Sequence, residues 1–394
     1  MSDLPSFDEF LRTLTGREPL PWQSRLAAQV DERGWPDVIG VPTGLGKSTC
    51  IDIATWAIAR DSERPTVERR HATRVWYVVN RRLLVDEAAD RADQLARLLN
   101  DPDGITEADL GSGSDLSAAR QVLTACAAAL RHRSKVHGSD GPLHASRLHG
   151  AYDQTVLPIS PGQPAILAST VPMFGSRLLF RGYGTGRYTR SIEAALAGTD
   201  ALVLLDEAHL SGPLLELIPR LVSADHGIER VLNEQRLHPQ LVQLTATAID
   251  NPGAERFDLD EADYGNPVVR ARLQAKKPTS VDSTDKKSIA TVLAKRAVEL
   301  ASGATTPQAI AVFVNSPARA RSVFAAVQKE VGKKDTAPRV TMLTGRMRSF
   351  DSAKVRSELL DHQTGLRSGR RRSNLDRSWI VIATQTLEVG ADLD

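Results

Sequence analysis

Short apolar runs alternate with longer amphipathic stretches along most of this sequence. The runs are rich in Val, Ile and Leu, as in RVWYVV and ALVLLD, and resemble strands buried on both faces. The stretches between them repeat apolar residues at helical spacing, as in RRLLVDEAADRADQLARLL. Predicted strands lie at 38–41, 75–79, 166–169 and 310–314 and at the start of 201–210 and of 379–394. Two more lie in 241–250, with its end at Thr245–Thr247, and in the run from Arg339 that ends at Thr344–Arg346. Strands that alternate with helices predict an α/β fold with parallel sheets.

A Gly-rich loop, PTGLGKS, joins the first strand to the helix that follows it. In this context several backbone N–H groups and the positive end of the helix dipole point at one spot. Lys47 adds a charge for the β- and γ-phosphates, and Ser48 offers a hydroxyl to Mg²⁺. Val41 stands where the usual phosphate loop has its first Gly, so Gly44 and Gly46 must supply the positive φ angles. We predict ATP and Mg²⁺ as cofactors, the alternative being an ordinary glycine turn. The candidate nucleotide-binding residues of the loop are Thr43, Gly44, Leu45, Gly46, Lys47, Ser48 and Thr49.

Two acidic residues follow the apolar run ALVLL. They begin the sequence Asp-Glu-Ala-His, which ends at His209. Asp206 at the end of such a strand can share Mg²⁺ with Ser48, and Glu207 can polarise the attacking water. We therefore predict that Lys47, Asp206 and Glu207 form the catalytic set. The next strand ends in Thr245-Ala246-Thr247, and we expect the hydroxyls of Thr245 and Thr247 to couple the nucleotide state to the acidic residues.

Three other positions are candidate nucleic-acid contacts. Arg81 follows the strand at 75–79 and either contacts a phosphate or begins a solvated helix. Thr170 lies at the end of the next strand, where a hydroxyl can bond a phosphate. Arg181 lies in RLLFRGYG, among aromatic residues that can stack on single-stranded bases. The alternative for this last run is a helix that buries Leu178, Leu179 and Phe180 against the sheet.

Composition narrows the class of protein. The chain has 394 residues, 41% hydrophobic and 25% charged, with a net charge of +2 that does not by itself indicate nucleic-acid binding. Two cysteines are too few for a disulfide framework, and neither a signal peptide nor a membrane-spanning run is visible. We expect a cytoplasmic protein with no membrane partner. Four histidines between 132 and 149 lack metal-ligand spacing, so we predict loops there rather than a metal site.

Changes in composition suggest two domains. We expect the first at 1–265, with an insertion at about 101–165 that carries loops and an Ala-rich helix from Leu116 to His132. A polar, Lys/Arg-containing stretch predicts a linker at 266–290. The second domain is expected at 291–394.

The ordered motifs resemble those of superfamily 2 DNA helicases. They span nearly the whole chain and read PTGLGKS, DEAH, TAT, VFVNS, LTGRM and ATQTLEVGAD. Within that superfamily the chain is similar to the CRISPR-associated helicase–nuclease of type I interference systems. The runs ATQTLEVGADLD and STV…GSRLLFRGYG carry this likeness, and the second is similar to the subtype U (or G) branch. The resemblance implies two RecA-like P-loop NTPase domains, the second incomplete.

The resemblance also implies an activity and partners. It implies ATP-driven movement along single-stranded DNA, recruitment by a guide-RNA surveillance complex (Cascade-like), and delivery of DNA to an HD nuclease domain in cis or in trans. Gln23 would contact adenine. Thr170, Arg346 and Gln385 would lie along DNA, whereas Gly390 and Asp392 would face the nucleotide from the second domain.

Two departures from that family affect the expected activity. The family's arginine finger follows the last strand, and this sequence ends at Asp394, so we expect ATP binding with poor turnover. No His is followed by Asp, so we expect no nuclease activity from these residues. The alternatives are a general superfamily 2 DNA or RNA helicase and a truncated nucleic-acid-binding remnant without turnover.

Overall fold

The chain folds into two compact units, Met1–Ala275 and Lys276–Asp394. The computed structural model describes residues 4–65, 68–110, 115–134, 141–149, 160–232, 237–246, 253–276, 278–332, 337–359, 361, 365–366 and 375–384. The first unit includes 266–275, where the sequence pattern predicts the start of a linker. Those residues instead form a short helix, α10 (Pro267–Leu273), that begins at an Asn266 N-cap.

The first unit is built on a seven-stranded sheet in the order β3-β4-β2-β5-β6-β1-β7. Every strand pair in it is parallel, and Asp206 and Ile39 both lie level with Leu244 of the strand between them. The carboxyl ends of β5, β6 and β1 therefore meet at one edge. The strands are β1 (Val38–Gly40), β2 (Arg74–Val79), β3 (His144–Leu148), β4 (Ala165–Thr170), β5 (Ala201–Asp206), β6 (Gln240–Leu244) and β7 (Arg256–Asp258).

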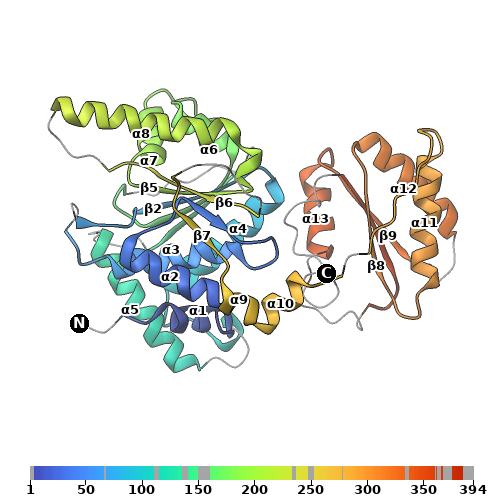
Figure 1. Ribbon diagram of the computed structural model, residues 1–394, viewed down its shortest axis with the longest axis horizontal. Coiled ribbons are helices and arrows are strands. Elements are labelled where there is room, and N and C mark those ends of the chain that lie inside the picture. Colours follow the sequence, from blue (N-terminus) through green and yellow to red (C-terminus); the bar gives the residue numbers. More distant parts are fainter. Residues whose placement is uncertain are drawn as a thin grey trace. The chain divides into compact units, whose positions relative to one another are not determined.

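Helices cover both faces of this sheet (Figure 1). Successive side chains of a strand point to opposite faces. Tyr77 accordingly packs in one apolar cluster with α1 to α5, whereas Trp76 packs in another with α6, α7 and α8. The helices are α1 (Phe7–Thr15), α2 (Pro21–Arg33), α3 (Cys50–Arg60), α4 (Arg82–Asn100), α5 (Leu116–Ser134), α6 (Val171–Leu178), α7 (Arg190–Gly198), α8 (Gly212–Leu232) and α9 (Glu261–Gly265).

The stretch at 101–165 contains the predicted helix and also a strand that was not predicted. Its helix α5 buries Leu123, Cys126 and Leu130 in the same cluster as α3 and α4. Its strand β3 pairs with β4 and extends the sheet at one end. The sequence of β3, HASRL, is too polar to be predicted as a strand, because only alternate residues are buried.

The second unit has a three-stranded parallel sheet in the order β8-β10-β9. Its central strand is buried along its whole length, and α11 and α12 pack an Ala- and Val-rich face on the sheet. The elements are α11 (Ile289–Gly303), β8 (Ala309–Phe313), α12 (Pro317–Val331), β9 (Arg339–Leu343), α13 (Ser349–Leu359) and β10 (Trp379–Ala383). Among the described residues of both units, no helix has the length and apolar character needed to cross a membrane.

Candidate nucleotide site

The predicted phosphate loop joins β1 to α3 with two residues in the left-handed region. Gly44 has φ 83° and Gly46 has φ 79°, and a side chain at either position would strain the turn. After Gly46 the chain enters a 3₁₀ turn, Lys47–Thr49, that leads directly into α3 at Cys50. Thr43, Gly44 and Ser48 are exposed, whereas Leu45 is fully buried. The loop thus presents backbone and the Ser48 hydroxyl to solvent and is anchored by an apolar side chain.

Two side chains of helix α2 donate hydrogen bonds to the phosphate loop. Trp22 Nε1 donates to the carbonyl oxygen of Leu45 at 3.2 Å. Gln23 Nε2 donates to Thr49 Oγ1 at 3.0 Å, and Gln23 Oε1 accepts from the backbone N–H of Leu20 at 2.8 Å. These bonds use one donor and one acceptor of the Gln23 amide and leave one of each. The structure therefore places Gln23 beside the loop, and Trp22 is a support that the sequence pattern did not reveal.

Lys47, near the end of the phosphate loop, lies close to the two acidic residues at the end of β5, Asp206 and Glu207. Its side chain is 7% exposed, and Nζ lies 3.8 Å from Asp206 Oδ1 and 3.6 Å from Glu207 Oε1. Both separations exceed a hydrogen bond, and Nζ has no hydrogen-bond partner in the described part of the chain. A buried ammonium without a hydrogen bond is costly, and an anionic ligand would relieve that cost. The arrangement can thus accept phosphate oxygens at Lys47.

Two hydrogen-bond donors hold the carboxylate of Asp206 in place. Tyr77 Oη donates to Asp206 Oδ2 at 2.9 Å, and the backbone N–H of Glu207 donates to Oδ1 at 3.0 Å. Burial nevertheless raises the pKa of Asp206, an effect that the Lys47 charge and the Tyr77 hydrogen bond oppose. A divalent cation would stabilise the ionised form of such a carboxylate. Asp206 is therefore a fitting Mg²⁺ ligand, with the Ser48 hydroxyl as the second candidate.

Glu207 adopts a left-handed backbone conformation, with φ 50°, where the strand turns into the next element. Non-Gly residues in this region are uncommon and cluster at functional sites. His209 Nδ1 lies 3.6 Å from Glu207 Oε2, so the side chain of Glu207 lies between Lys47 and a partly exposed imidazole. The carboxylate is thus placed beside the site that phosphate would occupy, as a group that polarises water must be.

Strand β6 brings Thr245 between the loop and the acidic residues. The sheet order puts β6 between β5 and β1, and Thr245 N donates to the Ile39 carbonyl oxygen at 3.1 Å. Thr245 is fully buried at this edge. Its predicted partner in coupling, Thr247, lies outside the described residues.

A contact from α10 to the phosphate loop was not expected from the sequence. The guanidinium of Arg272 donates to the carbonyl oxygen of Gly44. The two residues are 228 positions apart, and Arg272 lies in a basic stretch that resembled a linker. No local sequence signal could have linked them.

Arg81 and Thr170 lie on neighbouring strand ends of the first unit. Val79 of β2 is level with Thr170 of β4, and Arg81 follows Val79 closely, as the N-cap of α4. Thr170 is mostly buried and is the N-cap of α6. Both residues therefore lie at the same carboxyl edge of the sheet as the phosphate loop.

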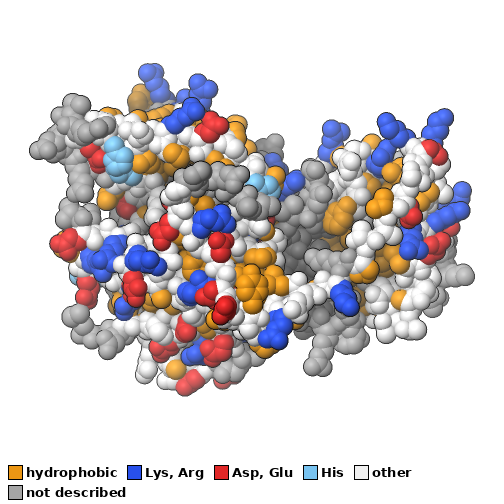
Figure 2. All heavy atoms as spheres, in the orientation of Figure 1, with side chains coloured by type: hydrophobic (Ala, Val, Ile, Leu, Met, Phe, Trp, Pro, Cys, Tyr) orange, Lys and Arg blue, Asp and Glu red, His pale blue; other side chains and the backbone are white. Residues whose placement is uncertain are grey.

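Arg181 lies in an exposed turn after α6. Phe180 and Tyr183 beside it are 58% and 65% exposed, so neither ring is part of the core, whereas Leu178 is buried. Arg177, by contrast, is buried, donates to the Met173 carbonyl oxygen and pairs with Glu193. Only the later part of RLLFRGYG is therefore accessible to a ligand. On the face shown in Figure 2, described acidic and basic side chains of the first unit are interspersed.

In the second unit, Arg346 is exposed in the turn after β9. Gln385, Gly390 and Asp392 lie outside the described residues.

Comparison with known proteins supports the fold. No protein-family profile matches this sequence, and no curated protein matches it. Both units have the parallel α/β architecture of the RecA-like domains of helicases.

Three solved structures are similar over nearly the whole chain. Mycobacterium smegmatis helicase Lhr bound to ssDNA and AMP-PNP is 17% identical with a TM-score of 0.50, and the match covers 100% of this chain and 43% of the Lhr chain. Cas3-ATP from T. fusca is 15% identical with a TM-score of 0.54, and the match covers 99% of this chain and 42% of the Cas3 chain. The DUF1998 helicase MrfA bound to DNA is 16% identical with a TM-score of 0.53, and the match covers 100% of this chain and 46% of the MrfA chain. This chain thus spans less than half the length of these proteins, and at such identities the likeness concerns the fold.

Proposed function

We propose that this chain is the ATP-driven motor of a helicase or translocase that acts on single-stranded DNA. The observation that carries the proposal is the position of Lys47. This buried ammonium forms no hydrogen bond with the residues that the structure describes and lies near two carboxylates at the end of a Gly-rich loop. Lys47 would bind the β- and γ-phosphates, Ser48 and Asp206 would hold Mg²⁺, and Glu207 would polarise the attacking water. The nucleotide-bound states of the Lhr and Cas3 structures support an adenine nucleotide as ligand.

Supporting roles follow from the neighbouring residues. The remaining donor and acceptor of Gln23 would pair with the adenine edge. Thr43 to Thr49 would enclose the phosphates, and Thr245 with Thr247 would couple hydrolysis to the strand ends. From the second unit, Gly390 and Asp392 would face the nucleotide.

The DNA path would follow residues at the strand ends. Arg81 and Thr170 would contact phosphates, and Arg181 would do so beside Phe180 and Tyr183, which can stack on bases. Arg346 and Gln385 would extend this path in the second unit. The DNA in the Lhr and MrfA structures supports a DNA strand as the substrate.

The biological setting that we propose is CRISPR type I interference. A guide-RNA surveillance complex would recruit the motor, and an HD nuclease domain, in cis or in trans, would cut the DNA that it delivers. The sequence runs ATQTLEVGADLD and STV…GSRLLFRGYG support this setting over a general repair or RNA helicase. The fold does not distinguish the two, since it is as similar to Lhr and MrfA as to Cas3.

The proposal is tested by calorimetry of ATP binding in the presence of Mg²⁺. Lys47→Ala removes the charged donor, and we expect the Kd for ATP to rise roughly 10- to 150-fold, since a hydrogen bond to a charged group contributes about 1.5–3 kcal/mol. Lys329→Ala, an exposed lysine of α12, is the matched control and should bind as the wild type does.

A second measurement compares single-stranded DNA with RNA of the same sequence. The proposal predicts that DNA binds more tightly and raises ATP turnover more than RNA does. Failure of wild-type protein to bind ATP would refute the motor, and a preference for RNA would favour the general helicase. Unchanged activity in Lys47→Ala would favour a nucleic-acid-binding remnant.

A further inference from the structure

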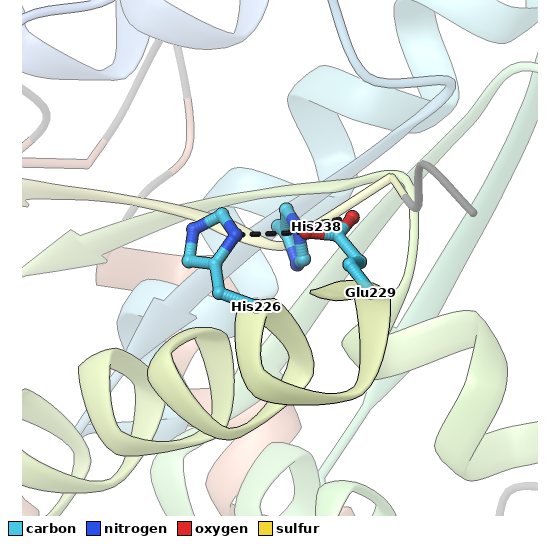
Figure 3. A group of neighbouring side chains, drawn as sticks. All are labelled: His226, Glu229 and His238. Atoms are coloured by element: carbon cyan, nitrogen blue, oxygen red, sulfur yellow. Dashed lines mark hydrogen bonds and ion pairs between the residues drawn. The ribbon is translucent and has the colours of Figure 1, made fainter. Parts of the chain in front are cut away.

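Three potential metal ligands converge at the edge of the first unit's sheet that is opposite the phosphate loop. His226 and Glu229 lie near the end of α8, and His238 lies just before β6 (Figure 3). One ligand atom from each residue lies within 4.8 Å of the others. His226 Nδ1 is 2.9 Å from Glu229 Oε2, and His238 Nε2 is 3.0 Å from Glu229 Oε1. The carboxylate therefore presents one oxygen to each imidazole.

The local fold explains why these side chains meet. Residues three apart on a helix share a face, which places His226 and Glu229 side by side. The chain then returns from α8 to the start of β6, which brings His238 over the same face, with its ring centroid 4.3 Å from that of His226. The site thus joins the end of one element to the beginning of the next.

Hydrogen bonds within the cluster do not satisfy a neutral His238. A neutral imidazole has one N–H and one lone pair. If Nε2 carries the hydrogen and donates to Glu229, the lone pair of Nδ1 is buried without a donor, and Nδ1 has no hydrogen-bond partner among the described residues. If Nδ1 carries the hydrogen, the lone pair of Nε2 faces a carboxylate oxygen at 3.0 Å. A cation bound at Nε2 removes this conflict.

We propose that His226, Glu229 and His238 bind one divalent transition-metal ion of the Zn²⁺ type. Imidazole nitrogens and a carboxylate are ligands that Zn²⁺ prefers, with bonds of about 2.0–2.2 Å, so tetrahedral ligands stand roughly 3.3 Å apart. Each imidazole nitrogen is 2.9 or 3.0 Å from one Glu229 oxygen, a few tenths of an ångström short of that spacing. One ligand atom from each of the three residues lies within 4.8 Å of the others, so a small side-chain adjustment would complete the set. When Nε2 of His238 binds the ion, the hydrogen is on Nδ1. Nδ1 then faces Asp225, whose Oδ2 lies 3.7 Å away. A carboxylate in that place orients a metal-bound histidine.

The exposure of the site indicates a ligand that enters from solvent. The His226 side chain is 55% exposed, and Figure 2 shows histidine atoms at the surface on the side of the first unit where α8 lies. Water can therefore complete the coordination. Because α8 begins after the acidic residues at Asp206 and Glu207, and β6 ends before Thr245, the ion would cross-link two elements that also frame the nucleotide edge. Its role would be structural.

The test uses the full chain, free of any histidine tag, without nucleotide or DNA. We expect calorimetry to show one equivalent of Zn²⁺ bound, and Co²⁺ in its place to give the visible absorption of a four-coordinate nitrogen–oxygen site. His226→Gln removes an exposed ligand with little cost to the core. It should weaken Zn²⁺ binding by more than the roughly 10- to 100-fold that loss of an outer-shell partner causes.

Two further variants separate the site from adventitious binding. Asp225→Asn should weaken Zn²⁺ binding by roughly 10- to 100-fold, because it removes only the orienting carboxylate. His132→Gln changes an exposed histidine of α5 and should leave binding unchanged. Zn²⁺ should also raise the Tm of wild-type protein and of His132→Gln, and should do so much less for His226→Gln.

The outcomes decide the assignment in either direction. If wild-type protein takes up no more Zn²⁺ than His226→Gln, the proposal is overturned, and the cluster is a hydrogen-bonded pair of imidazoles around a carboxylate. Equal loss of binding in His132→Gln would likewise overturn it, since the metal would then bind surface histidines in general. A folded His226→Gln protein, verified by its unchanged ATP binding, keeps loss of the metal distinct from loss of the fold.

Discussion

The two edges of the first unit's sheet hold opposite kinds of charge arrangement. At the carboxyl edge a buried ammonium, Lys47, lies beside two carboxylates and forms no hydrogen bond with the described residues. The amino edge is the opposite one, where the strands begin. There one carboxylate, Glu229, lies between the imidazoles of His226 and His238. The first arrangement leaves a cation that an anionic ligand can satisfy. In the second, a neutral His238 has no tautomer in which the described residues satisfy both of its ring nitrogens, and a metal ion would relieve that conflict. The two edges thus favour ligands of opposite charge.

The edges also differ in how the chain builds them. At the carboxyl edge a contiguous loop supplies most of the groups, and the helix that follows adds its dipole. At the amino edge the groups come from the end of a helix and from just before the start of a strand. We therefore expect the carboxyl edge to carry the chemistry and the amino edge to contribute to stability.

The largest effect should come from Glu207→Gln. The amide keeps the size of the side chain but cannot accept a proton from water, and loss of a general base typically lowers a rate by 10²- to 10⁴-fold. ATP binding should stay within about threefold, because Lys47 and the loop are intact. Single-turnover phosphate release with single-stranded DNA present measures the loss.

Its matched control is Glu216→Gln, an exposed glutamate of α8 that should leave the rate unchanged. The comparison between the edges adds a second readout, since Zn²⁺ uptake at His226 should be the same in both variants. A Glu207→Gln protein that hydrolyses ATP at the wild-type rate would show that the acidic pair does not polarise the water.

A smaller effect is expected from Gln23→Ala. Its amide supports the loop through Thr49 and has one donor and one acceptor left for adenine. Loss of one or two neutral hydrogen bonds of about 0.5–1.5 kcal/mol each should raise the Kd for ATP roughly 2- to 150-fold. The Kd for GTP should change less, because only adenine would use the remaining groups.

Gln29→Ala, on the same helix and paired with Glu255, controls for a general effect on α2. Calorimetry with both nucleotides distinguishes the two roles of Gln23. Equal losses for ATP and GTP would mean that Gln23 only supports the loop, and no loss would remove it from the site.

Contiguous features were predictable from the sequence, and contacts between distant residues were not. The parallel strands follow from apolar runs, and the order of loop, acidic pair and Thr245 follows from where strands end, as the structure shows. The sequence pattern predicts for Tyr77 only a place in a buried strand. In the structure its hydroxyl donates a hydrogen bond to Asp206, which lies 129 positions further along the chain. A motif search cannot find such a pair, because either residue alone looks like an ordinary core or strand-end residue.

The amino edge shows the same limit more strongly. The spacing of His226 and Glu229 places them on one helix face, but the third ligand, His238, joins them only after the chain turns back into β6. Of the histidines between 132 and 149, where the sequence predicts loops and no metal site, His149 pairs with Asp86 and His144 with Ser146. Strand β3 was missed for a related reason, since a polar edge strand lacks an apolar run.

The smallest effect concerns stability at the carboxyl edge. Burial raises the pKa of Asp206, so at neutral pH the ionised carboxylate costs the folded unit free energy that the protonated form does not. Asp206→Asn should therefore raise the Tm at pH 8 without nucleotide, by about 2–4 °C for each kcal/mol recovered. This advantage should shrink as the pH falls and Asp206 becomes protonated in the wild type. Calorimetric scans at both pH values measure it.

Asp103→Asn, at an exposed position, should show no such pH dependence. A lower Tm for Asp206→Asn at pH 8 would mean that attraction to Lys47 exceeds the cost of burial, so that the acidic pair stabilises the empty fold. A higher Tm means the opposite: the carboxyl edge keeps a charge that destabilises it until Mg²⁺ and phosphate arrive. In that case stability and ligand binding are opposed at the carboxyl edge, whereas Zn²⁺ at the amino edge would only add to stability.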